Sequence, residues 1–186
     1  MQKAIPLYRI QEMIERISSI QQIERSFNVS EEVLVSMKPR GFNRWCQLPY
    51  HKHPNGCPNF GIKDSCPPNT PYFLDVYEEK IFIAYLKFDF KSYLKWRQDV
   101  HPDWGNREIR NPRHFQNHLD AILRGEIKNL DPGYVKDRVT VFSPEAMSVN
   151  MHLTCRNTGI ELEWPPSEIM YRIAFLAQPK DLSVRR

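Results

Sequence analysis

KIFIAYLKFDF, at residues 80–90, is the segment of the chain that most strongly predicts a β-strand. Aromatic and β-branched residues fill it, which is typical of strands. IMYRIAFLA at 169–177 has the same character, and shorter strands are expected at 31–39 and 137–143. The sequence therefore predicts a sheet of about four strands.

Amphipathic helices are expected around these strands, because apolar residues recur at helical spacing in residues 8–26, 91–100, 111–127 and 143–158. Asn111 and Ser143 are suited to cap two of these helices, each with proline at the next position, and Gly159 provides a stop. Helices interspersed with strands indicate an α/β fold of the mixed α+β type, with three to four helices packed on the sheet.

The bulk composition limits the class of protein. With 186 residues, 41 % hydrophobic and 12 % aromatic, the chain is expected to form a single domain, 1–186, with a substantial core. No apolar run is long enough to span a membrane, and the N-terminus lacks the apolar block of a signal peptide. We therefore expect a cytoplasmic protein without a membrane partner. Its net charge of +4 permits an anionic partner.

Residues 40–76 are rich in proline, asparagine and cysteine and predict one long structured loop. A loop of this length in a compact domain needs something to order it, and a bound metal would do so. Cys46, Cys57 and Cys66 fall in this loop with the spacing C-x10-C-x8-C, and Cys155 lies in the predicted helix at 143–158. These four cysteines are the candidate metal ligands, and four ordinary thiols are the simpler alternative.

The spacing of the cysteines favours an iron–sulfur cluster over zinc. Structural zinc sites usually contain CxxC, which is absent here, whereas proline after a ligand cysteine is a feature of ferredoxin-type loops. Zinc bound by three cysteines and a histidine remains the alternative. The fourth ligand is open between Cys155, His152, His51 and His53.

Two segments resemble a known family. GCPNFGIKDSCPPNTPYFLDVYEEK at 56–80 is similar to the C-x-x-Y/F-G…C-P-P signature of a family of small prokaryotic predicted metal-binding proteins. SPEAMSVNMHLTCRNTGIELEWPP at 143–166 resembles that family's later S-x-E-A…G block. The resemblance implies a metal at these cysteines and no settled activity. Members often carry further cysteines near the first, whereas here Cys46 stands alone.

A basic and aromatic segment occupies residues 91–118, where arginines and lysines alternate with Tyr93, Trp96 and Trp104. Arginines with aromatic residues are suited to phosphates and nucleobases. A solvated basic surface is the simpler interpretation. The candidate substrate-binding residues are Arg107, Arg110, Arg113, His114 and His118.

These features favour an iron–sulfur enzyme that acts on an anionic substrate such as a nucleotide or nucleobase, with modification of nucleic-acid bases as one form. The alternative is a zinc-stabilised nucleic-acid-binding module without catalysis. An electron-transfer protein is a third hypothesis. The chain has no Gly-rich phosphate loop, HExxH or GxSxG motif, so no catalytic residue is assigned.

Overall fold

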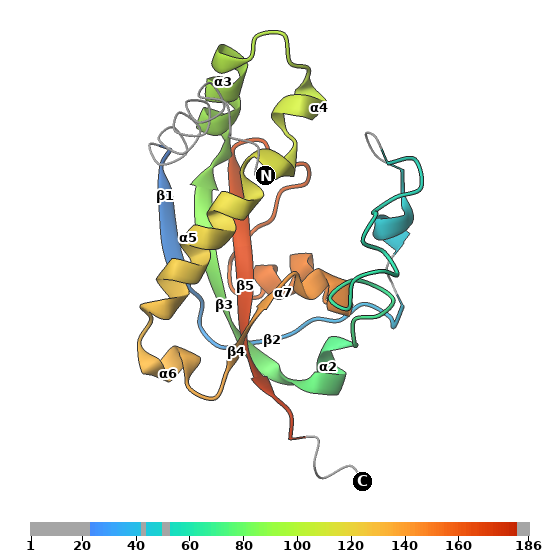
Figure 1. The fold of residues 1–186 in the computed structure, drawn as a ribbon. Coiled ribbons are helices and arrows are strands. Elements are labelled where there is room, and N and C mark those ends of the chain that lie inside the picture. The colour runs from blue at the N-terminus through green and yellow to red at the C-terminus, as the bar shows by residue number, and fades with distance from the viewer. Residues whose placement is uncertain (1–22, 42–43, 50–52, 182–186) are drawn as a thin grey trace, which may run out of the picture.

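The computed structural model describes residues 23–41, 44–49 and 53–181, and its centre is one β-sheet (Figure 1). The strands pair antiparallel in the order β1-β3-β5-β4, and β2 also pairs with β3. Their bounds are β1 Arg25–Val29, β2 Val33–Leu34, β3 Tyr77–Asp89, β4 Val139–Phe142 and β5 Ile169–Pro179. The two longest strands, β3 and β5, lie side by side at the centre of the sheet.

The helical segments of the described residues are mostly short. Five precede β4: η1 Arg44–Gln47, α2 Phe73–Val76, α3 Phe90–Val100, α4 Asn106–Ile109 and η2 Pro112–His114. The others are α5 Gln116–Lys128, α6 Pro132–Val135, η3 Pro144–Met147 and α7 Met151–Arg156. Figure 1 shows α5, the longest of them, lying along the sheet.

Hydrophobic cores form on both faces of the sheet, because successive side chains of a strand point to opposite faces. Leu86 and Phe88 of β3 belong to the core that contains Leu119 and Leu123 of α5. Ile81 and Ile83 of the same strand belong to the second core, with Phe73 of α2 and Cys155 of α7. The segment that most strongly predicted a strand is therefore buried from both sides.

The mixed α+β prediction is confirmed, and so are the long strands and the helices at 91–100 and 111–127. Asn111 accepts a hydrogen bond from the backbone N–H of Arg113, as a helix cap does, although a separate short turn, η2, precedes α5. Within the described segments the sheet has five strands rather than about four, because β1 was not predicted.

Three predicted boundaries were wrong. The helix predicted at 8–26 lies mostly outside the described residues, and Arg25 and Ser26 at its end belong to β1. The strand predicted at 31–39 is only Val33–Leu34. The helix predicted at 143–158 is divided into η3 and α7, because Ser148 adopts a left-handed conformation and Val149 bridges to Met37. Ser143 is also left-handed and makes no side-chain cap.

None of the helices in the described segments has the length and apolar character needed to cross a membrane.

Candidate functional site

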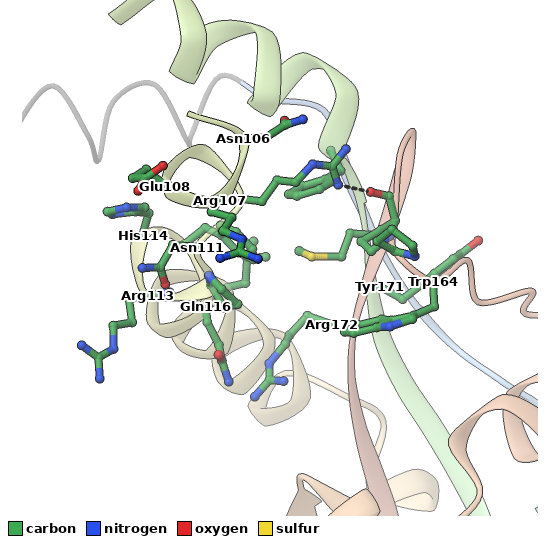
Figure 2. Close-up of a pocket in the computed structure, with 18 of the residues that line it drawn as sticks. Asn106, Arg107, Glu108, Asn111, Arg113, His114, Gln116, Trp164, Tyr171 and Arg172 are labelled. Atoms are coloured by element: carbon green, nitrogen blue, oxygen red, sulfur yellow. Dashed lines mark hydrogen bonds between the residues drawn. The ribbon is translucent and has the colours of Figure 1, made fainter. Parts of the chain in front are cut away.

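A cleft of about 1580 Å³ opens where three distant parts of the chain meet (Figure 2). The first wall is the arginine segment, which we define as residues 104–116. The second is the tryptophan segment, residues 163–168, together with the start of β5. The cleft is also lined by Pro49, His53 and Pro54 of the cysteine loop, and by Phe90, Leu119 and Glu145. The cleft therefore joins the arginine segment to the loop that carries the cysteines, although none of Cys46, Cys57 and Cys66 is among its lining residues.

Four of the five predicted substrate-binding residues line this cleft: Arg107, Arg110, Arg113 and His114. Arg107 on α4 and Arg113 on η2 are exposed. Arg110 is half-buried, and its Nη1 donates a hydrogen bond to the carbonyl oxygen of Pro166 at 2.7 Å. Arg107 and Arg113 are thus positioned to meet a ligand, whereas Arg110 also holds the cleft together.

An aromatic stack supports the arginine segment from behind. Trp104 lies parallel to His101, with ring centroids 3.9 Å apart, and tilted against His114 at 5.0 Å. The guanidinium of Arg97 lies 4.6 Å from the centroid of Trp104, and Arg97 is only 1 % exposed. Trp104 and His114 line the cleft, whereas Arg97 serves as a buried cation beneath them.

His118 is placed apart from the other predicted binding residues. It is absent from the lining of the cleft, and its Nε2 is buried without a hydrogen-bond partner among the described residues. Burial, and after it the charge of Arg25, lowers the pKa of His118 and so favours its neutral form. The structure therefore does not bring His114 and His118 to one ligand.

The sequence analysis missed the opposite wall, which Trp164, Tyr171 and Arg172 provide (Figure 2). Arg172 of β5 forms an ion pair with Asp120 of α5 and lines the cleft as well. These residues looked like an ordinary strand and the segment before it. The WPP sequence at 164–166 was the one signal that could have drawn attention to them.

Glu145 contributes a carboxyl group to the same cleft. Its residue is open to solvent, yet the surrounding walls desolvate it and raise its pKa, while Arg172 and Lys38 oppose that rise. Because the Glu145 carboxyl is accessible to solvent, we attribute its desolvation to the walls of the cleft and not to burial in the core. A carboxyl with a raised pKa in a cleft is suited to exchange a proton with a ligand.

The cysteine loop, residues 40–72, is ordered in the described residues by its own backbone hydrogen bonds. The N–H of Cys57 donates to the carbonyl of Cys46 at 2.7 Å. The carbonyl of Cys57 accepts from Phe60 at 3.1 Å, and that of Cys66 accepts from Asn69 at 3.0 Å. Proline follows each of these two cysteines and fixes the next φ of the turn.

Cys57 and Cys66 lie close enough to Cys46 for their charges to affect its pKa. Desolvation raises the pKa of Cys46 most, and the charges of Cys57, Cys66 and Glu145 raise it further. Yet no three His, Cys, Asp or Glu side chains in the described part of the chain converge as a preformed metal site. The soft sulfur donors suit a metal in kind, and a bound cation would offset the desolvation and the like charges that raise the pKa of Cys46.

Cys155, the fourth predicted ligand, is a core thiol. Its residue is fully buried in the core of α2 and α7, and burial alone raises its pKa to about 12. His152, on the same helix, is exposed. Of the other two histidines considered as ligands, His53 lines the cleft and His51 lies outside the described residues.

No family model, curated protein or solved structure matches this chain. The likeness of 56–80 and 143–166 to predicted metal-binding proteins therefore stays a prediction. What the described residues offer is an arginine-lined cleft that Pro49, His53 and Pro54 of the cysteine loop help to line.

Proposed function

We propose that the protein binds a nucleotide or nucleic acid in the cleft and holds an iron–sulfur cluster at Cys46, Cys57 and Cys66, and so acts as an enzyme on that ligand. One observation carries the proposal: the cysteine loop and the arginine segment, far apart in sequence, line the same cleft. We place this activity in the cytoplasm, where thiols remain reduced and able to bind metal.

The side chains of the cleft have distinct roles in this proposal. Arg107 and Arg113 are exposed and bind the phosphates, since guanidinium groups make charge-assisted hydrogen bonds to phosphate oxygens. His114 and Trp104 offer flat rings beside them. Glu145 lies on the cleft wall, and its charge contributes to the raised pKa of Cys46. In this proposal Glu145 exchanges a proton with the bound ligand. An iron–sulfur cluster held by Cys46, Cys57 and Cys66 would supply Lewis-acid chemistry to the ligand.

The alternative proposal is a zinc-stabilised nucleic-acid-binding module without catalysis. His53 favours it, because this residue of the cysteine loop lies at the cleft and supplies a nitrogen donor. Three sulfurs and one nitrogen form a common ligand set of structural zinc. In this case the metal adds to the backbone hydrogen bonds that order the loop, and the arginine cleft alone carries the function.

Anaerobic purification with iron, sulfide and zinc analysis separates the two proposals. We expect iron and sulfide in the wild type, and loss of both in Cys57→Ser and Cys66→Ser. Cys155→Ala is the matched control, because this thiol lies in the core, and it should keep its metal if circular dichroism shows a folded chain. A colourless protein with one zinc would favour the alternative. Unchanged metal in both loop variants would overturn the metal site.

Binding of the anionic ligand is tested separately by the anisotropy of a labelled oligonucleotide over a salt series. We expect affinity to fall with salt, by a slope of about 0.7 per phosphate contact for single strands. Arg107→Ala and Arg113→Ala should each lower that slope. Lys128→Ala removes one exposed positive charge at the far end of α5 and should leave the slope unchanged. Binding that ignores salt would contradict the proposal.

A further inference from the structure

Trp164 is the most exposed large hydrophobic residue in the described part of the chain, with 89 % of its surface accessible. It also lines the cleft, opposite the arginine segment (Figure 2). Leaving an indole in water forgoes the free energy that its burial would contribute. An exposed aromatic ring in an arginine-lined cleft is best explained by a ligand that covers the ring.

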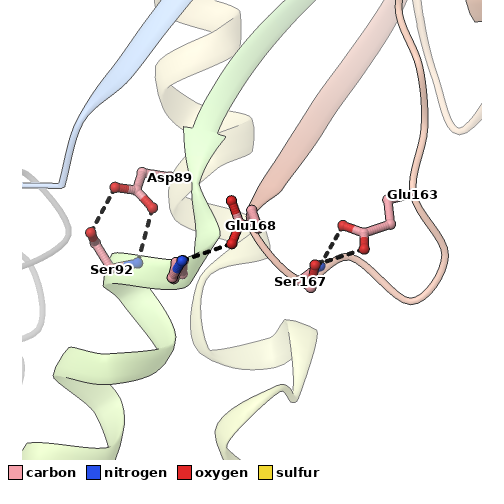
Figure 3. Close-up of polar contacts among 6 residues, drawn as sticks. Asp89, Ser92, Glu163, Ser167 and Glu168 are labelled. Atoms are coloured by element: carbon pink, nitrogen blue, oxygen red, sulfur yellow. Dashed lines mark hydrogen bonds and ion pairs between the residues drawn. The ribbon is translucent and has the colours of Figure 1, made fainter.

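The tryptophan segment is held at both ends rather than loosely attached. The carboxylate of Glu163 accepts hydrogen bonds from the backbone N–H of Ser167 at 2.8 Å and from its hydroxyl at 2.6 Å (Figure 3). Arg110 binds the carbonyl of Pro166 at 2.7 Å from across the cleft. Pro165 and Pro166 further restrict the backbone after the indole.

The end of this segment is fixed to the start of α3. The carbonyl of Glu168 accepts from the backbone N–H groups of Phe90 at 2.9 Å and Lys91 at 3.0 Å. Lys91 Nζ also pairs with Glu168 Oε1 at 2.7 Å (Figure 3). The backbone that carries the indole is therefore held in place, and a ligand that stacks on Trp164 has to order only the side chain.

The size of the cleft points to a ligand larger than one nucleotide. Sites for small molecules usually enclose about 300 to 1,000 Å³, whereas this cleft is about 1580 Å³. Arginines on one wall and an open indole on the other match the two parts of a nucleic-acid strand, the phosphates and the bases. In a duplex both faces of an internal base are already stacked, so an indole platform selects unpaired bases.

We propose that the cleft binds single-stranded nucleic acid and that one unpaired base stacks on Trp164 while Arg107 and Arg113 contact the phosphates. This inference rests on the proposed function and narrows its ligand from nucleotides and nucleic acids in general to single strands. Trp164 supplies the preference for unpaired bases, and the arginines supply the affinity that depends on salt.

The test compares binding of the same mixed sequence as labelled single-stranded DNA, single-stranded RNA and duplex DNA, with inorganic polyphosphate as a competitor without bases. Trp164→Ala should weaken single-strand binding by about 5- to 100-fold, since base stacking on an aromatic ring accounts for a loss of that size. Its salt slope should remain that of the wild type. Trp164→Phe should retain most of the affinity. Whichever of single-stranded DNA and RNA binds more tightly shows which sugar, deoxyribose or ribose, the cleft prefers.

Leu34→Ala is the matched control, because Leu34 is 52 % exposed but does not line the cleft. It should bind as the wild type does. The inference would be overturned if Trp164→Ala bound the single strand as tightly as the wild type does, or if the duplex bound more tightly than the single strand. The proposed function would still stand if that binding depended on the arginines. Absence of salt-dependent binding to every polymer, polyphosphate included, would overturn both the inference and the nucleic-acid form of the proposed function.

Discussion

Arg110 Nη1 donates a hydrogen bond of 2.7 Å to the carbonyl oxygen of Pro166, which ties the arginine segment to the tryptophan segment across the cleft. The two residues are 56 positions apart in the chain. The guanidinium also lies 5.6 Å from the centroid of the Phe90 ring. One side chain thus fixes the separation of the two walls that contact the proposed strand.

Arg110→Ala should therefore impair both stability and binding. A hydrogen bond from a charged donor contributes about 1.5 to 3 kcal/mol, and its removal leaves the half-buried carbonyl of Pro166 without this partner. Urea denaturation should show a loss of that order. Arg113→Ala, at an exposed position, should change the free energy of unfolding by less than about 0.5 kcal/mol and weaken only binding. Equal stability of the two variants would contradict the bridging role.

Asp89→Ala should destabilise the start of α3. The carboxylate accepts from the backbone N–H of Ser92 at 2.9 Å and from its hydroxyl at 2.6 Å (Figure 3). Loss of such a cap costs about 0.5 to 2 kcal/mol. Chemical denaturation at pH 7 measures it, and Asp89→Asn, which retains a cap oxygen, should lose less.

The contribution of Asp89 should also depend on pH. The hydrogen bonds from Ser92, side chain first and backbone second, lower the pKa of Asp89 in the folded state. The stabilisation is therefore complete above the unfolded pKa of about 3.9 and is lost as the pH falls through the lower folded value. The stability difference between wild type and Asp89→Asn should shrink over this acidic range. A difference that stays constant would contradict the cap.

Cys155 should resist thiol reagents while the chain is folded. It is fully buried, and its pKa of about 12 leaves almost no thiolate at pH 8. In reduced protein stripped of metal, mass spectrometry after brief alkylation should find Cys46, Cys57 and Cys66 modified and Cys155 protected. Denaturation should expose the fourth thiol. Rapid native labelling of Cys155 would contradict its place in the core.

Gly56→Ala should disrupt the cysteine loop. A β-carbon there would lie 2.5 Å from the carbonyl oxygen of Cys46, and the residue has a φ of +84°. The backbone contact between Cys46 and Cys57 would have to open. Gly61→Ala is the control, since its φ is +70° but the nearest atom is 4.0 Å away, so only the left-handed penalty of about 1 to 2 kcal/mol applies.

Limited proteolysis and metal content measure that pair of variants. Gly56→Ala should be cut faster within the cysteine loop and should hold less metal than Gly61→Ala. If both variants kept the loop protected to the same degree, the close approach of the two backbones would not be what orders it.

Local patterns were enough to predict the long strands and α5. The aromatic and β-branched residues of 80–90 and the apolar spacing of 111–127 are signals within one element. β1 was missed because its short alternation follows directly on an apolar pattern of helical spacing. The break between η3 and α7 was missed because the bridge between Met37 and Val149 sets it from outside the segment.

The same distinction applies to the cleft. Arg107, Arg110 and Arg113 lie close together in the sequence, so their shared location could be predicted. Trp164 and Arg172 reach the cleft only through the pairing of β5 with β3, which no local pattern indicates. Cys155 looked like a ligand by residue type alone, and only the packing of α7 shows that it is a core residue.

The two ends of the cysteine loop are fastened to each other. The hydroxyl of Tyr72 donates to the carbonyl of Lys38 at 3.3 Å, and Arg40 pairs with Asp75 at 2.5 Å. The chain thus leaves and re-enters the sheet at nearly one place, as in an insertion. A short linker could therefore replace residues 41–71 without changing the rest of the fold. The same loop could in turn be inserted between two strands of another sheet.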